Sequence, residues 1–366
     1  MPGPLPFLQE SFLTDRNESI AKWQKKYHNK ERNRPQKKDL LQSGSNLNIS
    51  RYLTMIPKVY IDGKEGTTGL QIYQRLGERC DIELLLIDED KRKDREERRK
   101  FINAADLVFL CLPDAAAVEA VELVENDHTR IIDASTAHRT AAGWTYGFPE
   151  LSQAQREAVS DSKRVANPGC HATGFISCVY PLVKAGLLPA DADLNCFSLT
   201  GYSGGGKKMI AQYEGDEKPL SLFSPSIYAL GQGHKHLPEM KAVCGLEKEP
   251  VFCPIVADYY KGMATTIPLH MDQLNGANSL KQIWEALNDC YAGQKLVKVA
   301  PLGGPESGKL YGNALAYSNG LELHVAGNDE RFTVTALFDN LGKGASGAAV
   351  QNMNLMLGFE ETEGLL

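Results

Sequence analysis

Apolar residues in the first half of the chain recur in short runs, which polar, helix-compatible segments separate. The runs are "KVYID" (58–62), "DIELLLID" (81–88), "DLVFLCL" (106–112) and "TRIIDAS" (129–135). Nearly continuous apolar runs are typical of strands buried on both faces, and the helical segments between them predict parallel strands. We therefore expect an α/β, Rossmann-type domain in which helices cover both faces of a doubly wound sheet.

The pattern changes near residue 170, where longer strands replace the regular alternation. Strands are expected within 192–204, 250–271 and 321–340, with one helix over 279–293. Many strands with few helices indicate an α+β domain. The closing "GKGASGAAVQNMNLMLGF" (342–359) predicts a Gly-rich turn followed by an apolar helix.

These patterns predict three parts. Residues 57–169 and 340–366 form the Rossmann domain, and residues 170–339 form the α+β domain. Residues 1–56 carry a local charge of +5, which leaves −11 on the other 310 residues. Because this basic stretch is poor in apolar residues, we expect a disordered or dispensable extension. A targeting or anion-binding arm is the alternative, and Met55 is an alternative start of the protein.

Composition narrows the class of protein. The net charge of −6 over 366 residues argues against a general nucleic-acid binder. No apolar run approaches the length of a membrane span, and the first ten residues lack the pattern of a secretory signal. The eight cysteines form no C-x-x-C pair, which suits neither a zinc ribbon nor a disulfide framework. We expect a cytoplasmic protein with reduced thiols.

A glycine-rich turn, "DGKEGTTG", directly follows the first strand. It places Gly63, Gly66 and Gly69 at three-residue intervals, with Thr67 and Thr68 between the last two, and a helix is expected from Thr68 to Gly77. Glycines allow a sharp turn and let backbone N–H groups approach a pyrophosphate at the N-terminus of a helix. A dinucleotide cofactor is therefore predicted, although a structural turn would give the same spacing.

The second strand ends where a Rossmann domain binds the ribose. An acid there suits a 2′-hydroxyl, whereas Arg or Lys suits a 2′-phosphate. Asp88, Lys91 and Arg92 are all present in "IDEDKRKD". This stretch therefore leaves NAD and NADP both open, and the charges could also be a solvated helix start.

Cys170 lies between "NPG" and an apolar helical run, "HATGFISCVYPLV". A thiol at a helix N-terminus meets unpaired N–H groups and the positive end of the dipole, which lower its pKa. We therefore consider Cys170 a candidate nucleophile, and a buried core cysteine is the equal alternative. Cys178, two turns later, is expected in the core.

A nucleophilic thiol needs a base, and "GHKHLPEM" supplies His234 and His236. Glu239 in the same segment could orient one of them. A metal site is the less favoured alternative because no further His or Cys cluster lies nearby in the sequence. A non-catalytic pair of histidines is also compatible with the spacing.

Together these motifs resemble the N-acetyl-γ-glutamyl-phosphate reductases, in their shorter subgroup within the semialdehyde dehydrogenases. The resemblance covers residues 57–359 and rests on "IDASTAHR", "YGFPEL", "NPGCHATG", "GYSGGGKK", "GHKHLPEM" and "NLGKGASGAAVQNMNLM". It implies an NADP(H)-binding Rossmann domain and a second domain that carries the substrate site and the oligomer interface. The implied partners are a small acyl phosphate and other copies of the chain, as a dimer or tetramer.

The resemblance also implies residue roles. Cys170 would attack the acyl phosphate, release phosphate and leave a thioester, which NADPH reduces to the aldehyde. His234 is assigned as the acid/base, with a pKa near neutrality, and His236 as a substrate contact, although the two could exchange roles. The remaining implied residues bind substrate (Arg139, Ser135, Asn167, Lys207) or lie near the cofactor (Gly63, Gly66, Thr67, Thr68, Gly69, Asn340, Gly344).

Each assignment has a structural alternative. Arg139 could be a surface ion pair, "GYSGGGKK" a tight hairpin and the last segment a docking helix. The chain departs from the family at His171, where a tyrosine is usual, and at Lys207, where many relatives have arginine. Aspartate-semialdehyde dehydrogenase is the nearest rival enzyme, followed by a nucleotide-binding regulator and a cysteine hydrolase.

Overall fold

The computed structural model describes residues 56–366. The predictions for the basic extension therefore lie almost wholly outside the described residues. Within the described part, no helix combines the length and apolarity needed to cross a bilayer.

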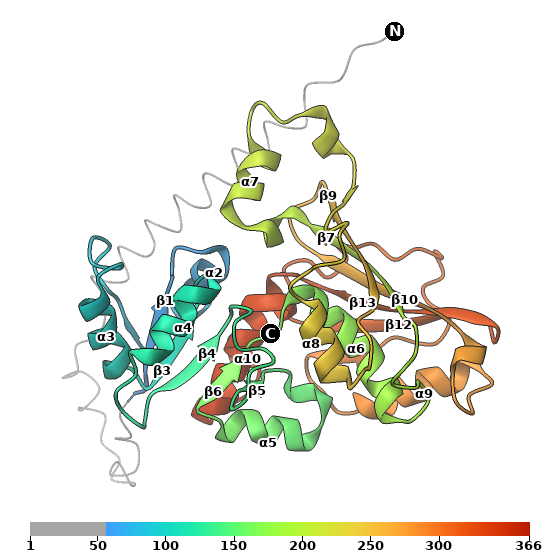
Figure 1. Ribbon diagram of the computed structural model, residues 1–366, viewed down its shortest axis with the longest axis horizontal. Coiled ribbons are helices and arrows are strands. Elements are labelled where there is room, and N and C mark those ends of the chain that lie inside the picture. Colours follow the sequence, from blue (N-terminus) through green and yellow to red (C-terminus); the bar gives the residue numbers. More distant parts are fainter. Residues whose placement is uncertain (1–55) are drawn as a thin grey trace, which may run out of the picture. The chain divides into compact units, whose positions relative to one another are not determined.

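The first sheet has six strands, all parallel, in the order β2-β1-β3-β4-β6-β5 (Figure 1). Its strands are β1 (Lys58–Asp62), β2 (Glu83–Leu85), β3 (Leu107–Leu110), β4 (Arg130–Asp133), β5 (Thr145–Tyr146) and β6 (Arg164–Ala166). Val59 and Ile61 of β1 face one core, whereas Tyr60 faces another on the opposite side. This alternation of buried residues confirms a sheet that is covered on both faces.

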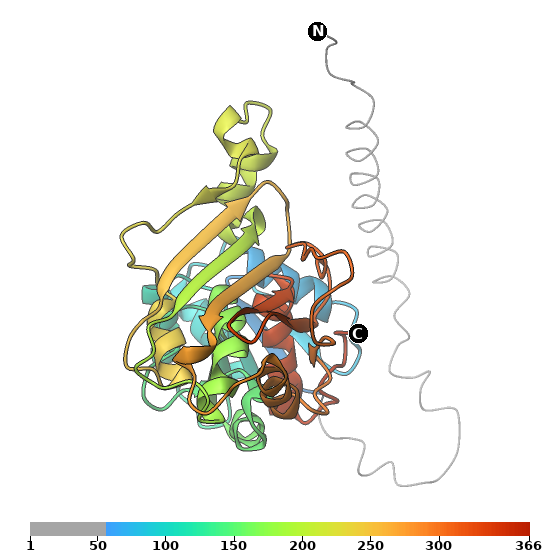
Figure 2. The ribbon, with the colours of Figure 1, turned by 90° about the vertical axis from the view of Figure 1, so that its right-hand side faces the viewer.

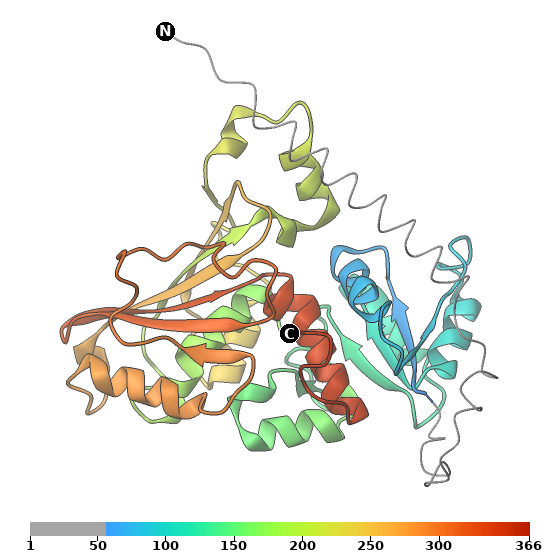
Figure 3. The same cartoon turned by 180° about the vertical axis from the view of Figure 1, so that it is seen from behind.

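Five helices cover the two faces of this sheet. They are α2 (Thr67–Leu76), α3 (Arg95–Ala104), α4 (Asp114–Glu122), α5 (Gln153–Asp161) and α10 (Gly347–Leu357). Apolar side chains of α2, α5 and α10 join one core, and those of α3 and α4 join the other. The C-terminal helix α10 thus returns to the first sheet, where Figure 3 shows it in red.

The second sheet has seven strands of mixed direction, in the order β11-β12-β13-β10-β7-β9-β8. Its strands are β7 (Asn195–Gly201), β8 (Ser226–Ile227), β9 (Val251–Ala257), β10 (Met263–His270), β11 (Val297–Val299), β12 (Leu321–Gly327) and β13 (Arg331–Phe338). Helices α6 (Cys170–Lys184), α8 (Leu237–Cys244) and α9 (Leu280–Cys290) share its large apolar core. The α/β plus α+β fold class is therefore confirmed.

The other face of the second sheet is partly uncovered near β7, β9 and β8, which lie side by side (Figure 2). Phe197, Val251 and Ile227 are each about half exposed there, at 46%, 54% and 55%. Ile227 pairs with Ile255, and Ile255 pairs with Leu199, so one apolar row crosses three strands. Residue 206 begins helix α7 (Gly206–Glu214), which follows β7 and a short 3₁₀ turn.

Candidate active site

Cys170 lies where the two sheets meet. Strand β6 is the last strand of the first sheet along the chain, and a turn at Asn167–Gly169 follows it. Helix α6 then begins at Cys170 and packs on the second sheet. A cavity of about 400 Å³ opens at this point. Among the predicted site residues, nine line it: Thr67, Thr68, Arg139, Asn167, Cys170, His234, His236, Asn340 and Gly344.

The turn before Cys170 requires glycine at position 169. An added Cβ atom would lie 2.4 Å from Nη1 of Arg139 and 2.6 Å from both Oε1 of Glu239 and Nε2 of His236. The backbone of the turn thus comes within contact distance of three polar side chains. This close approach explains the "NPGC" sequence better than any need for an unusual backbone angle, since φ is −76°.

A buried polar network lies beneath the turn. Glu239, 1% exposed, accepts hydrogen bonds from Nη1 of Arg139 (2.6 Å), the hydroxyl of Tyr146 (2.7 Å) and the N–H of Gly169 (3.1 Å). Arg139 also donates to the carbonyl groups of Asn167 (3.0 Å) and Ala134 (3.2 Å). Arg139 is therefore a buried ion pair rather than a surface one. Glu239 holds the arginine and not a histidine.

Two predicted substrate residues have structural partners. The hydroxyl of Ser135 donates to Asp133 at 2.7 Å, and Ser135 does not line the cavity. Asn167 does line it, but its amide donates to the carbonyl of Ala345 (3.0 Å) and accepts from Asn352 (3.2 Å). These side chains fix the loops around the cavity.

Lys207 also lies outside the cavity lining. It is exposed in the first turn of α7, while the preceding Gly204 and Gly205 line the cavity together with Met209. The segment is a 3₁₀ turn followed by a helix, so the tight-hairpin alternative is wrong.

The thiol of Cys170 is partly exposed to the cavity, and its pKa differs from the sequence expectation. Burial raises the pKa of Cys170, although the charge of Arg139 and the N–H of His171 act to lower it. Desolvation of the thiolate thus outweighs the helix N-terminus in this form of the protein. Cys178 is fully buried in the core, as predicted.

Both histidines of the "HKH" segment are uncharged at neutral pH. Burial, reinforced by Lys235 and Arg139, lowers the pKa of His234 to about 4, so the expected value near neutrality is wrong. Burial lowers the pKa of His236 as well. Nδ1 of His236 is buried and has no hydrogen-bond partner within residues 56–366. Within the same range, no three His, Cys, Asp or Glu residues are arranged to hold a metal ion.

The lining also includes His171, Tyr228 and Lys235, which the sequence analysis did not assign to the site. His171 is buried, and its ring nitrogens lie 2.7 Å from the hydroxyl of Ser198 and 2.6 Å from that of Tyr228. The available signal was position in the chain, since His171 follows Cys170 and Lys235 lies between the two histidines, with Tyr228 in the same segment.

The closing segment reaches the cavity from the side of α10. Asn340 accepts from the N–H of Gly262 (2.9 Å) and donates to the hydroxyl of Ser203 (3.0 Å). Gly344 lies against Cys170, because an added Cβ would be 3.0 Å from Cβ of that cysteine. The segment is therefore part of the cavity wall and more than a docking helix.

The glycine-rich turn is tightly packed. Gly63 has φ of +87°, and an added Cβ would lie 2.3 Å from the carbonyl oxygen of Cys111. At Gly69, an added Cβ would lie 2.4 Å from the carbonyl oxygen of Gly63. Gly66 precedes α2, whose first turn contains neither a side-chain cap nor an acidic residue. The N–H groups at this helix start are available to an anion.

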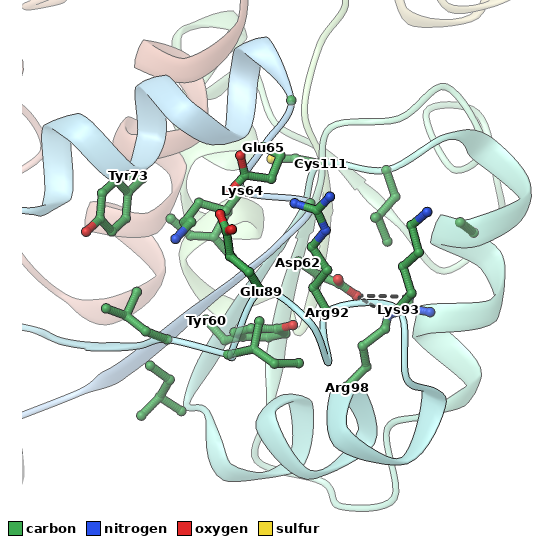
Figure 4. A pocket seen from close by; sticks show the side chains of 18 of the residues that line it. Tyr60, Asp62, Lys64, Glu65, Tyr73, Glu89, Arg92, Lys93, Arg98 and Cys111 are labelled. Carbon is green, nitrogen blue, oxygen red and sulfur yellow. Dashed lines mark hydrogen bonds and ion pairs between the residues drawn. The ribbon is translucent and has the colours of Figure 1, made fainter.

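A second cavity, of about 490 Å³, lies on the other side of this helix start (Figure 4). Gly63 and Gly66 line it, together with Arg92, Lys93 and Glu89, whereas Thr67 and Thr68 line the cavity of Cys170. Asp88 and Lys91 pair with each other at 3.5 Å and are absent from the lining. The turn thus lies between this second cavity and Cys170.

An ion pair supports this second cavity. Asp62, at the end of β1, accepts from Nε (3.0 Å) and Nη2 (2.9 Å) of Arg98, and both residues are buried. Figure 4 shows the pair beside Arg92 and Lys93. The cavity is also lined by the cations Arg92, Lys93 and Lys64, which form no ion pair among the residues described, and by the carboxylates Glu65 and Glu89.

Two domain families match the chain. Residues 86–159 match the semialdehyde dehydrogenase NAD-binding domain. Residues 170–340 match the semialdehyde dehydrogenase dimerisation domain. The fold agrees, since the aspartate semialdehyde dehydrogenase II of Vibrio cholerae superposes with a TM-score of 0.62 at 15% identity, covering 83% of this chain and 99% of that one.

The chain shares a much higher sequence identity with other proteins. The chain is 47% identical over 319 residues to N-acetyl-γ-glutamyl-phosphate reductase 2 of Nostoc sp., covering 84% of this chain and 99% of the relative. It is 49% identical over 311 residues to the N-acetyl-γ-glutamyl-phosphate reductase of Brucella anthropi, covering 83% and 99%. With Cys170, the paired histidines and the glycine turn in place, this chain belongs to the N-acetyl-γ-glutamyl-phosphate reductase family of the semialdehyde dehydrogenases.

Proposed function

We propose that the protein reduces N-acetyl-γ-glutamyl phosphate to N-acetylglutamate 5-semialdehyde, with NADPH as reductant and release of phosphate, in arginine biosynthesis. The observation that carries the proposal is the position of Cys170. It starts α6 in a cavity that also holds Arg139, His234 and His236, and Gly344 forms the adjoining wall.

The cofactor pocket fits NADPH. The glycine turn offers backbone N–H groups to the pyrophosphate, and Arg92 and Lys93 offer cations to a 2′-phosphate. The aspartate semialdehyde dehydrogenase of Candida albicans, a structural neighbour with a TM-score of 0.57 and 14% identity, was solved with NADP. When bound, the cofactor supplies the hydride. Thr67, Thr68, Asn340 and Gly344 are proposed to lie along its path to Cys170.

Acyl transfer begins with removal of the thiol proton. Cys170 is a thiol when the site is empty because burial raises its pKa, and the neutral imidazole of His234 is able to accept its proton. The sulfur then attacks the acyl carbon, the carbon–oxygen bond to phosphate breaks, and a thioester remains on Cys170. The histidinium returns its proton to the alkoxide that forms when the thioester is reduced. The hydroxyl proton then passes back through His234 to the sulfur as the carbon–sulfur bond breaks, which releases the aldehyde and restores the thiol of Cys170.

Arg139 is proposed to hold the substrate phosphate. Three of its five guanidinium N–H groups bond to Glu239, Asn167 and Ala134, which leaves two without a partner among the described residues. The orphaned Nδ1 of His236 is a further substrate contact. Both side chains are fixed before substrate arrives, which lowers the entropic cost of orientation.

We also infer a homo-oligomer, in which the half-exposed apolar row of β7, β9 and β8 meets a second copy. The uncovered face lies within the residues that match a dimerisation domain. The eight unpaired cysteines support a cytoplasmic location. The proposed division assigns residues 57–169 and 340–366 to the cofactor, residues 170–339 to substrate and dimer, and residues 1–56 to a dispensable extension.

The reverse reaction tests the function. Purified protein receives N-acetylglutamate 5-semialdehyde and NADP⁺, and NADPH absorbance is followed with and without inorganic phosphate. Phosphate-dependent NADPH formation is expected, with much weaker activity on the shorter aspartate semialdehyde. Activity on aspartate semialdehyde alone would assign the chain the rival reaction. Inactivity with both aldehydes would leave only a nucleotide-binding role.

A further inference from the structure

A π-helical turn, Gly342–Ser346, joins the last strand to α10. π-Helical turns are rare and are frequently found at functional sites. Its Gly344 lies against Cys170, as described above. The carbonyl of Ala345 accepts a 3.0 Å hydrogen bond from Asn167, in the turn before the nucleophile.

The same turn also contacts the cofactor-binding helix. The hydroxyl of Ser346 lies 3.2 Å from Nε of Arg75 and 3.1 Å from the side-chain oxygen of Gln71, and both of these residues belong to α2. Five consecutive residues therefore contact the nucleophile and the helix whose start is proposed to hold the pyrophosphate.

A buried ammonium group sets the position of this turn. Lys343 is 2% exposed, and Nζ donates to Oε1 of Glu150 (2.6 Å) and to the side-chain oxygen of Gln351 (2.5 Å). It also lies 5.1 Å from the centre of the Phe148 ring. Glu150 is wholly buried, and its Oε2 has no hydrogen-bond partner within the described residues.

Such a pair is a poor way to stabilise a fold. Removing two charges from water is costly, and apolar side chains of similar volume are often at least as stabilising. The orphaned carboxylate oxygen adds to that cost. The pair instead fixes the position of the π-helical turn, because it links the turn to the segment Pro149–Leu151 and to α10.

We propose that Lys343 is a positioning residue of the reaction, which holds Gly344 against Cys170 and Ser346 against α2. The inference rests on the proposed role of Cys170 as nucleophile. Without the ammonium group, the turn relaxes away from the cysteine and water reaches the sulfur. Turnover then falls because sulfur and cofactor lose their relative placement, yet the thiol becomes easier to alkylate because less of it is buried.

The test compares Lys343→Met with the double variant Lys343→Met/Glu150→Leu, which replaces the pair by apolar side chains. Lys218→Met is the matched control, since Lys218 also forms an ion pair, with Asp258, but does not contact the turn. Melting temperature and the kcat and KM of the reverse reaction are measured. Iodoacetamide labelling is followed by mass spectrometry, with the buried Cys178 of the same helix as internal reference.

For Lys343→Met we expect kcat to fall by about 100-fold and KM for NADP⁺ to change by less than about threefold. Labelling of Cys170 should rise severalfold while Cys178 stays unlabelled. The double variant should regain melting temperature but not kcat. Recovery of both would mean a purely structural role and overturn the inference, as would unchanged labelling of Cys170. If even the unmodified protein turns over neither aldehyde, the proposed function fails, and the labelling ratio still decides the role of Lys343.

Discussion

The guanidinium of Arg139 donates a 2.6 Å hydrogen bond to the carboxylate of Glu239, which lies 100 residues further along the chain. The same carboxylate accepts from the N–H of Gly169. One buried acid therefore holds both the cation proposed to bind phosphate and the turn that carries the nucleophile.

Replacing Glu239 by glutamine should weaken the fold and change the thiol. The charge of Arg139 would stay buried without its counter-ion, so we expect a loss of about 3 kcal/mol in the free energy of unfolding. The carboxylate of Glu239 helps to raise the pKa of Cys170, so the variant should alkylate faster at neutral pH. Urea unfolding and iodoacetamide kinetics measure these effects, with the exposed Glu249→Gln as control. Unchanged thiol kinetics would contradict the proposed coupling.

A methyl group at position 169 should impair catalysis more than folding. In Gly169→Ala the new Cβ collides with Arg139, Glu239 and His236, so we expect kcat to fall by about 100-fold through displacement of Cys170. Gly231→Ala is the matched control, because a Cβ there meets nothing within 4 Å. Equal activity of both variants would show that the close approach at Gly169 has no catalytic consequence.

Acid should destabilise the protein through His171. Burial lowers the pKa of His171 to about 3 from 6.5, so below pH 6.5 the unfolded chain binds a proton that the native chain does not. Its contribution to stability is complete above pH 6.5 and is lost as pH falls toward 3, at about 1.4 kcal/mol per pH unit. Free energies of unfolding at several pH values should show a shallower acid slope in His171→Gln. Equal slopes for both proteins would contradict the assigned burial.

Cofactor preference should depend on Arg92 and not on its neighbour. Arg92 lines the second cavity, whereas Lys91 pairs with Asp88 outside the lining. For Arg92→Glu we expect KM for NADPH to rise about tenfold with little change for NADH. The substitution removes a charge-assisted hydrogen bond to the 2′-phosphate, which NADH lacks. Lys91→Glu is the control. A similar effect of both substitutions would exclude a specific contact by Arg92.

Local pattern was enough to predict the elements that carry the site. Continuous apolar runs gave the parallel sheet, and "NPG" before an apolar helical run placed Cys170 at the start of α6. The motifs, together with the resemblance, also assigned His234 as the acid/base, Arg139 to the substrate and Gly344 to the cofactor. All three line one cavity with Cys170.

Tertiary contacts explain what the sequence could not reveal. Glu239 follows the histidines closely in the chain, yet its partner is Arg139 on a distant loop. Burial lowers the pKa of His234 and raises that of Cys170, and burial depends on elements far apart in sequence. The bond from the hydroxyl of Ser135 to Asp133 likewise depends on the folded loop.

The most direct test of the account is to trap the acyl group on Cys170. The protein is mixed with N-acetylglutamate 5-semialdehyde and NADP⁺ without phosphate, and NADPH and the mass of the peptide containing residues 165–174 are followed. We predict one NADPH per active site, an N-acetylglutamyl thioester on Cys170, and discharge of the thioester with renewed turnover when phosphate is added. Steady NADPH formation without phosphate, or an acyl group on any other residue, would contradict the account.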